Sequence, residues 1–113
     1  MSYTGLWGNY PLNGETIDRI VTARSAGAYA LGYVSQGTFY VSYVGRSDDD
    51  LAARLKRHIG EYAAFQYAYM PSPSAAFEKE CRLYHEFNPP DNKVHPARPE
   101  GTNYRCPVLG CSH

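Results

Sequence analysis

The chain has 113 residues, enough for one domain with its own core but not for two. Lysine plus arginine balance aspartate plus glutamate, which argues against a protein that binds nucleic acid mainly through its overall charge. No apolar run approaches the ~20 residues that cross a bilayer, and the N-terminus lacks the pattern of a secretory signal. We therefore expect a single domain, residues 1–113, that is cytoplasmic and has no membrane partner.

The first predicted element in chain order is a short amphipathic helix, which Asn13 caps and which ends near Gly27. Two runs rich in Tyr, Val and Phe then flank the sequence SQG, a pattern that predicts a β-hairpin over residues 27–45. The next helix opens with Ser47 and three aspartates and ends at Gly60. We interpret the aspartates as complementing the positive end of this helix rather than as a metal cluster.

The second half of the chain predicts a third strand over residues 65–70 and a long helix that is capped near Ser74. The order of elements indicates an α+β fold with a small, mostly antiparallel three-stranded sheet flanked by helices. We expect its core to span about residues 15–95. An irregular C-terminal arm, rich in Pro and Gly, is expected over residues 96–113.

Two of the predicted helices carry polar residues where core residues are expected. At ~100° per residue, Arg54 and His58 fall on one edge of the apolar stripe that begins at Leu51. They are either partly buried structural residues at the edge of the core or a functional pair. Glu80 falls inside the apolar face of the later helix, where a carboxylate is costly unless it is paired or bound to a metal. A structural ion pair with Arg54 is one explanation of Glu80, and a functional carboxylate is the one that we favour.

These residue types together suit the hydrolysis of a phosphodiester. An arginine can stabilise charge on a phosphoryl group, and one carboxylate can hold a magnesium ion that keeps several waters. A phenol or an imidazole near that ion can take a proton from an attacking water. The sequence therefore predicts metal-assisted phosphodiester hydrolysis.

The order of short motifs points in the same direction. GAY at residues 27–29 and YVG at residues 43–45 lie on the predicted hairpin, and RLKRH follows at residues 54–58. An alanine-led helix then carries Glu80, and an asparagine comes after it. This order, which covers roughly residues 15–95, resembles the GIY-YIG nuclease superfamily. That family includes homing endonucleases, some restriction enzymes and the incision domain of bacterial nucleotide excision repair.

The resemblance implies a catalytic set of six residues: Tyr29, Tyr43, Arg54, His58, Glu80 and Asn92, with Asn88 as the alternative to Asn92. Glu80 would hold the single divalent ion, Mg²⁺ or another such as Mn²⁺. A motif tyrosine, with the histidine, would take the proton of the attacking water, while the arginine and the metal stabilise charge. Two departures are visible: Ala28 replaces the usual Ile or Val, and the stretch between Gly45 and Arg54 is a residue longer than in common members.

Contacts to the nucleic-acid backbone are predicted for three basic residues near this site: Arg46, Lys56 and Arg57. A solvated helix face is the alternative explanation of their charge. The resulting hypothesis is a metal-dependent endonuclease acting on DNA, with RNA not excluded and with a protein partner as one source of specificity. The alternative is a non-catalytic nucleic-acid-binding module that retains the fold. An interaction protein without a nucleic-acid role would require the ionic group to be wholly structural.

The chain has three cysteines, an odd number that indicates reduced thiols rather than a disulfide framework. Cys106 and Cys111, followed by His113, suggest a zinc site, but His95 would have to complete the four ligands. We favour reduced thiols in a terminal arm over zinc. Cys81 lies on the apolar helix face and is expected in the core.

Overall fold

The computed structural model describes residues 4–99 and 101–111. Its elements are β1 (Trp7–Pro11), α1 (Gly14–Ile20), β2 (Gly27–Ser35), β3 (Thr38–Ser47), α2 (Leu51–Lys56), β4 (Ala64–Tyr69) and α3 (Pro73–Phe87). None of these helices is long and apolar enough to cross a membrane. The described chain therefore has an α+β fold, as predicted.

The strands form one sheet in the order β1-β4-β2-β3, and all three pairings are antiparallel. The predicted antiparallel sheet is confirmed, but the predicted number of three strands is wrong. The additional strand is β1, which pairs with β4 at the outer edge. It has only five residues, includes Gly8 and ends in Pro11, and its side chains are largely exposed. Such a segment lacks the apolar alternation by which strands are predicted.

The predicted hairpin is confirmed and pairs β2 with β3 from Gly27 opposite Ser47 to Ser35 opposite Thr38. Its two-residue turn has positive φ angles at both Gln36 (51°) and Gly37 (78°). This conformation matches the right-handed twist of the strands, and glycine adopts it without steric cost. The hairpin thus brings the GAY and YVG motifs side by side.

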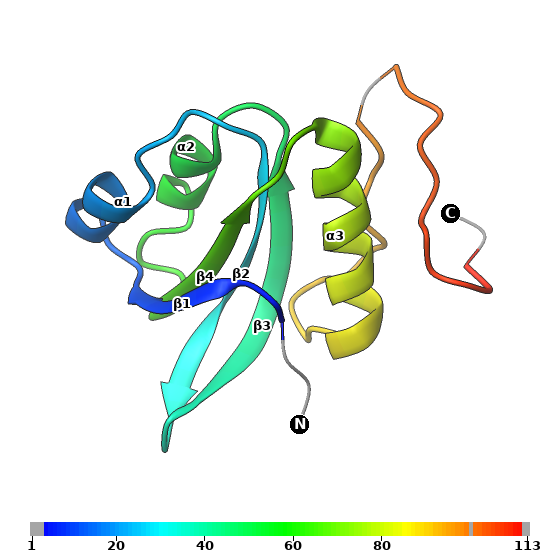
Figure 1. The fold of residues 1–113 in the computed structure, drawn as a ribbon. Helices are drawn as coiled ribbons and strands as arrows, with labels where there is room; N and C mark the ends of the chain where they lie inside the picture. The colour runs from blue at the N-terminus through cyan, green and yellow to red at the C-terminus, as the bar shows by residue number, and fades with distance from the viewer. Residues whose placement is uncertain (1–3, 100, 112–113) are drawn as a thin grey trace.

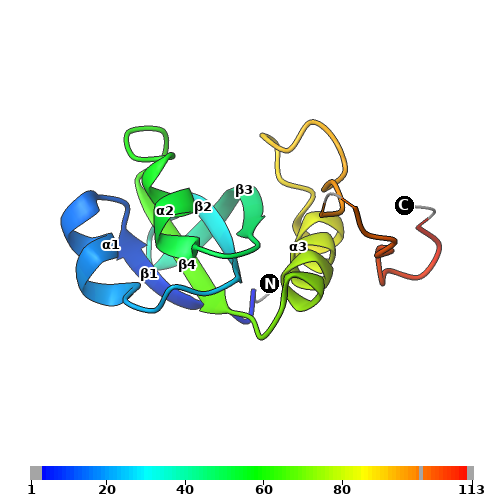
Figure 2. The ribbon, with the colours of Figure 1, turned by 90° about the horizontal axis from the view of Figure 1, so that it is seen from above.

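Helices cover both faces of the sheet. Figures 1 and 2 show α1 and α2 on one face and α3 on the other. The first face buries Tyr29 and Leu31 of β2 against Leu51 and Leu55 of α2. The opposite face buries alternate residues of the hairpin against α3, and its members include Ala30, Val44 and Leu83. Because β3 is the outer strand of the hairpin, groups from both layers can meet at its free edge.

Two helices, α1 and α2, end earlier than predicted. Asn13 does cap α1, since its Oδ1 accepts from Thr16 N, but α1 ends at Ile20 rather than near Gly27. Asp50 caps α2, which ends at Lys56 and not at Gly60. The chain after Lys56 tightens into turns with bonds between residues three apart, as from His58 N to Leu55 O.

The C-terminal arm follows α3, which Asn88 caps in the left-handed conformation (φ 45°). Beyond this residue the described chain has no helix or strand. The arm, taken from here on as residues 89–99 and 101–111, first passes the free edge of β3 and then runs along the side of α3 that is remote from the sheet (Figures 1 and 2). Its Cys106 packs with Phe77 and Cys81 of α3 in a small buried cluster.

Candidate active site

A chain of hydrogen bonds links a buried tyrosine to a carboxylate through a histidine. The hydroxyl of Tyr29, on β2, lies 3.1 Å from His58 Nε2, and His58 Nδ1 lies 2.8 Å from Glu61 Oε1. Because a carboxylate only accepts, Nδ1 donates to Glu61, which leaves Nε2 of the neutral ring to accept from Tyr29. The three side chains are therefore aligned for proton transfer from Tyr29 to His58.

The glycines of the two hairpin motifs make room for this arrangement. A Cβ atom on Gly45 would overlap the hydroxyl and ring of Tyr29. A Cβ atom on Gly27 would lie 2.6 Å from Leu51 Cδ2 and 2.6 Å from the carbonyl oxygen of Ala68. Both distances are too short for real carbon atoms, so a larger residue at either position would displace the Tyr29 ring or α2. The GAY and YVG glycines are thus explained by packing around the site.

Two further tyrosines surround His58. The ring centroid of Tyr43 lies 5.4 Å from that of His58, and Tyr43 stacks on Tyr62 at 6.4 Å. The Tyr62 hydroxyl donates to Asp91 Oδ2 at 2.7 Å, which attaches the start of the arm to this group. Burial and the charge of Glu80 raise the pKa of Tyr43. The negative charge of Glu80, on the opposite face of the sheet, therefore acts electrostatically on Tyr43, the second motif tyrosine.

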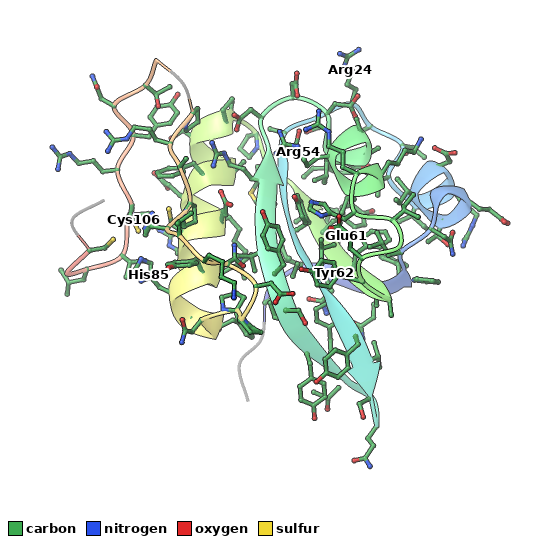
Figure 3. All side chains as sticks on the ribbon, turned by 180° about the vertical axis from the view of Figure 1, so that it is seen from behind. Arg24, Arg54, Glu61, Tyr62, His85 and Cys106 are labelled. Carbon is green, nitrogen blue, oxygen red and sulfur yellow. The ribbon has the colours of Figure 1, made fainter. Side chains whose placement is uncertain are left out.

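Arg54 brings a positive charge to the same group from α2. Its side chain is exposed, and its charge lowers the pKa of both Tyr29 and Tyr43. Burial is the larger effect at Tyr29 and keeps the pKa of that phenol well above its usual 10.0. Figure 3 shows Arg54 on the same side of α3 as Glu61 and Tyr62. An anion in solution can therefore reach this guanidinium.

Glu80 is buried on α3, in agreement with its predicted place on the apolar helix face. Its Oε1 accepts from Arg46 Nη1 at 2.7 Å. Arg46 also donates from Nε to Asp48 at 2.9 Å and from Nη1 to the carbonyl of Ala97, on the arm, at 2.6 Å. The alternative of a Glu80 ion pair with Arg54 is wrong, because the partner of Glu80 is Arg46.

The Glu80 carboxylate has one oxygen, Oε2, without a described hydrogen bond. Its described hydrogen bond is made by Oε1, and no buried side-chain oxygen of the described residues lacks a partner. Oε2 is therefore not fully buried. Burial raises the pKa of Glu80 to about 7, because desolvation outweighs the opposing effect of Arg46. A single carboxylate with one oxygen outside the Arg46 ion pair fits Mg²⁺, which usually binds through one or two carboxylates and keeps several waters.

The two candidates for the motif asparagine have different structural roles. Asn88 ends α3, whereas Asn92 makes two hydrogen bonds with the backbone of Val44 on β3. Val44 N donates to Oδ1 at 2.8 Å, and Nδ2 donates to Val44 O at 3.0 Å. Asn92 therefore fixes the arm to the residue that follows Tyr43, and it is the asparagine that adjoins the site.

The three basic residues predicted to contact nucleic acid occupy different environments. Arg46 is held by Glu80 and Asp48, and its side chain is only 13% exposed. Lys56 Nζ lies 2.5 Å from Asp18 Oδ1 on α1, so its charge is locally neutralised. Arg57 is exposed immediately after α2. The structure therefore does not bring the three together as one patch of free charge.

The cysteines and histidines of the arm lie on the other side of α3. Cys106, Cys111 and His95, three residues of the suggested zinc set, lie together with His85 of α3. His113, the fourth residue considered, lies outside the described residues. Figure 3 shows His85 and Cys106 on the arm side of α3, opposite Arg54.

Sequence reasoning did not identify Glu61, Tyr62 or Asp91. Glu61 lies three residues after His58, a spacing at which side chains meet in a helix or tight turn, so it could have been proposed as the histidine partner. Tyr62 and Asp91 meet through a contact between residues 29 positions apart in sequence, for which no local pattern exists.

Comparison of the chain with family models, with curated proteins and with solved structures finds no significant match.

Proposed function

We propose that this chain is a metal-dependent endonuclease of the GIY-YIG type that hydrolyses phosphodiester bonds in DNA. The supporting observation is the grouping of Tyr29, Tyr43, His58 and Arg54 beside β3, with Glu80 acting electrostatically on both phenols. The order of these residues in the sequence, which resembles that superfamily, is a second and independent support.

Glu80 is the residue expected to hold the divalent ion, through Oε2, the oxygen that is not bonded to Arg46. An ion bound there would neutralise negative charge on the scissile phosphate. Arg54 offers a second positive charge from α2, and a guanidinium can bind two phosphate oxygens at once. The two charges come from helices on opposite faces of the sheet, so a phosphate lying along the free edge of β3 would be held between them.

Tyr29 and His58 provide a route for the proton of the attacking water. Because burial keeps the pKa of Tyr29 high, the phenol is protonated at neutral pH and cannot act alone as a base. It can accept a proton from water only as it passes its own proton to His58 Nε2. The carboxylate of Glu61 then stabilises the imidazolium through Nδ1. The resulting hydroxide attacks phosphorus as the P–O bond to the leaving oxygen breaks, and that oxygen takes a proton from solvent water.

A second candidate function is a non-catalytic nucleic-acid-binding module. The observation that favours it is the ion pair between Glu80 and Arg46, which balances the carboxylate without a metal ion. In that case the exposed guanidinium groups of Arg54 and Arg57 would bind the phosphate backbone, and the buried pair would only hold the fold together.

The proposal is tested by cleavage of supercoiled plasmid, branched DNA and RNA with and without Mg²⁺. We expect Glu80→Ala to reduce the Mg²⁺-dependent rate by about 100-fold or more, because the ligand for the ion is removed. Glu78→Ala is the matched control, since Glu78 lies two residues earlier on α3 and has no described ion pair or hydrogen bond. That variant should cleave at the wild-type rate.

The two candidate functions predict different outcomes. Equal cleavage by wild type and Glu80→Ala, with circular dichroism showing both folded, would contradict the role given to Glu80. No cleavage by the wild type with Mg²⁺ or Mn²⁺, together with DNA binding in a mobility-shift assay, would favour the binding module.

A further inference from the structure

Four side chains with soft ligand atoms converge between α3 and the arm. They are His85, near the end of α3, and His95, Cys106 and Cys111 of the arm. The candidate ligand atoms, one nitrogen or sulfur from each residue, all lie within 4.8 Å of one another. The distance from Cys111 Sγ to His95 Nε2 is 3.4 Å.

We propose that these four residues form a structural zinc site. Tetrahedral zinc with Zn–S near 2.3 Å and Zn–N near 2.0–2.1 Å places its ligand atoms about 3.3–3.8 Å apart. The Cys111–His95 distance already meets this requirement, and an inward movement of about 1 Å brings the widest pair into range. Two thiolates with two imidazoles are one of the common donor sets of structural zinc.

The donor set also distinguishes zinc from other metals. Mg²⁺ and Ca²⁺ prefer oxygen ligands, which this group lacks. A two-iron centre with two cysteines and two histidines places the two residue types on different irons. Ligand atoms drawn together within 4.8 Å instead surround a single ion. Proximity of all four therefore favours one tetrahedral ion of zinc type.

The orientation of His95 provides an independent argument. Its Nδ1 lies 2.9 Å from the carbonyl oxygen of Pro96, which can only accept, so Nδ1 carries the proton. Nε2 is then unprotonated in the neutral ring and is the nitrogen that points at Cys111. Zinc-bound histidines characteristically donate their other ring nitrogen to a carbonyl or carboxylate in this way. The His95 ring therefore has the orientation and the tautomer that a zinc ligand requires, with Nε2 unprotonated and facing the site.

A zinc ion would explain how the arm keeps a fixed position without helix or strand. Three of the four ligands come from an irregular segment, and the fourth comes from a regular helix. The ion would therefore join the arm to α3, and binding free energy would offset the entropy lost on ordering the arm. The same arm presents the Ala97 carbonyl to Arg46, so the zinc site would also support the Arg46–Glu80 pair.

The test measures the metal content of the full-length protein by plasma mass spectrometry after incubation with zinc and extensive dialysis. We expect about one zinc per chain in the wild type. Loss of an outer-shell partner alone typically weakens metal affinity about 10–100-fold, so loss of a ligand should weaken it at least as much. Cys106→Ser, Cys111→Ser and His85→Ala should therefore lose zinc on dialysis against a competing chelator that wild type resists.

Cys81→Ala is the matched control, because Cys81 is a buried thiol beside Cys106 that is not one of the four ligands. It should retain zinc. His85 is exposed, so His85→Ala tests the site even if the cysteine variants fail to fold. Cobalt(II) in place of zinc should give the visible bands of a tetrahedral site and a thiolate charge-transfer band.

Two results would overturn the proposal: a wild-type protein that binds less than about a tenth of an equivalent of zinc, or a folded His85→Ala variant with wild-type zinc affinity. Hydrogen exchange gives a readout of the structural role. Chelation should increase exchange in residues 91–99 and 101–111 and at Val44 N–H, which donates to Asn92, but not in the rest of the β2–β3 hairpin. Because these measurements do not involve DNA cleavage, they stand apart from the test of the proposed function.

Discussion

The two sides of α3 carry different kinds of candidate metal ligand: carboxylate oxygen on one side, and nitrogen and sulfur on the other. Glu80 faces the sheet with one carboxylate, and His85 faces the arm beside another histidine and two thiols. The two residues are five positions apart, which turns them about 140° from each other on a helix. An open oxygen site suits an ion that exchanges with substrate and water, whereas a closed nitrogen and sulfur site suits a permanent ion. In the two proposals, one helix therefore serves a reaction on one side and holds the fold together on the other.

The largest expected effect is the loss of cleavage when His58 is substituted. It distinguishes the two sides of α3, because zinc binding should not change. His58→Ala removes the acceptor of the Tyr29 proton and should reduce cleavage by about 100-fold or more. Glu61→Gln weakens one charge-assisted hydrogen bond and should lower kcat by about tenfold with little change in KM. Single-turnover cleavage measures both variants. Each should keep its zinc, and a parallel loss of zinc would show that the two sides are not independent.

A second prediction concerns pH. Burial raises the pKa of Glu80 to about 7, so protons should compete with the proposed Mg²⁺ for its carboxylate below that pH. The Mg²⁺ concentration for half-maximal cleavage should rise about tenfold for each pH unit below 7 and be constant above pH 8. Cleavage titrated with Mg²⁺ from pH 5.5 to 8.5 measures this. If the Mg²⁺ concentration for half-maximal cleavage does not change with pH, Glu80 is not a ligand of the metal.

The raised pKa of Glu80 also makes the free energy of unfolding depend on pH in the absence of metal. The carboxyl pKa is 4.5 without the shift and about 7 in the folded chain, so the folded form binds the proton more tightly. The contribution of Glu80 to the free energy of unfolding is therefore greatest below pH 4.5. It falls as the pH rises from 4.5 to 7 and then stays constant. Mg²⁺ should recover stability above pH 7.

The smallest expected effect is on stability, and it tests the hydrogen bonds between the arm and β3. Asn92→Ala leaves the buried N–H and C=O of Val44 without their partner, which should cost about 1–3 kcal/mol of unfolding free energy. Urea denaturation measures it, with the exposed Asn103→Ala as control. Zinc content should be unchanged. A variant as stable as the wild type would show that the arm is held in place by its contacts with α3 alone.

The parts of the fold that follow local rules could be predicted from sequence. The hairpin has two β-favouring runs with a short turn between them, and Glu80 could be placed inside because helix periodicity defines the buried face of α3. The end of α2 could not be predicted, because Arg57 and His58 have ordinary helix propensities and the tight turn depends on contacts beyond the segment. The strand β1 forms only because β4 offers it an edge.

Partners within the candidate site were harder to predict than the site residues themselves. Arg46 follows the hairpin motif and has the charge of a backbone-binding residue, but strand alternation points it toward α3 and Glu80. His85 lies on the polar face of α3, where no buried or ligand role is predicted from helix periodicity. Its association with Cys106 depends on the path of the arm, which carries no periodic signal.

The first residues of the arm also protect the sheet from other molecules. β3 is an outer strand, and Asp91 N donates to Ser42 O at 3.0 Å while Asn92 satisfies both polar groups of Val44. An uncovered outer strand is a template on which a second chain can add a strand and begin aggregation. If the arm is released by chelation of zinc, this strand becomes available for pairing. Self-association into β-rich aggregates is therefore the expected fate of the metal-free protein.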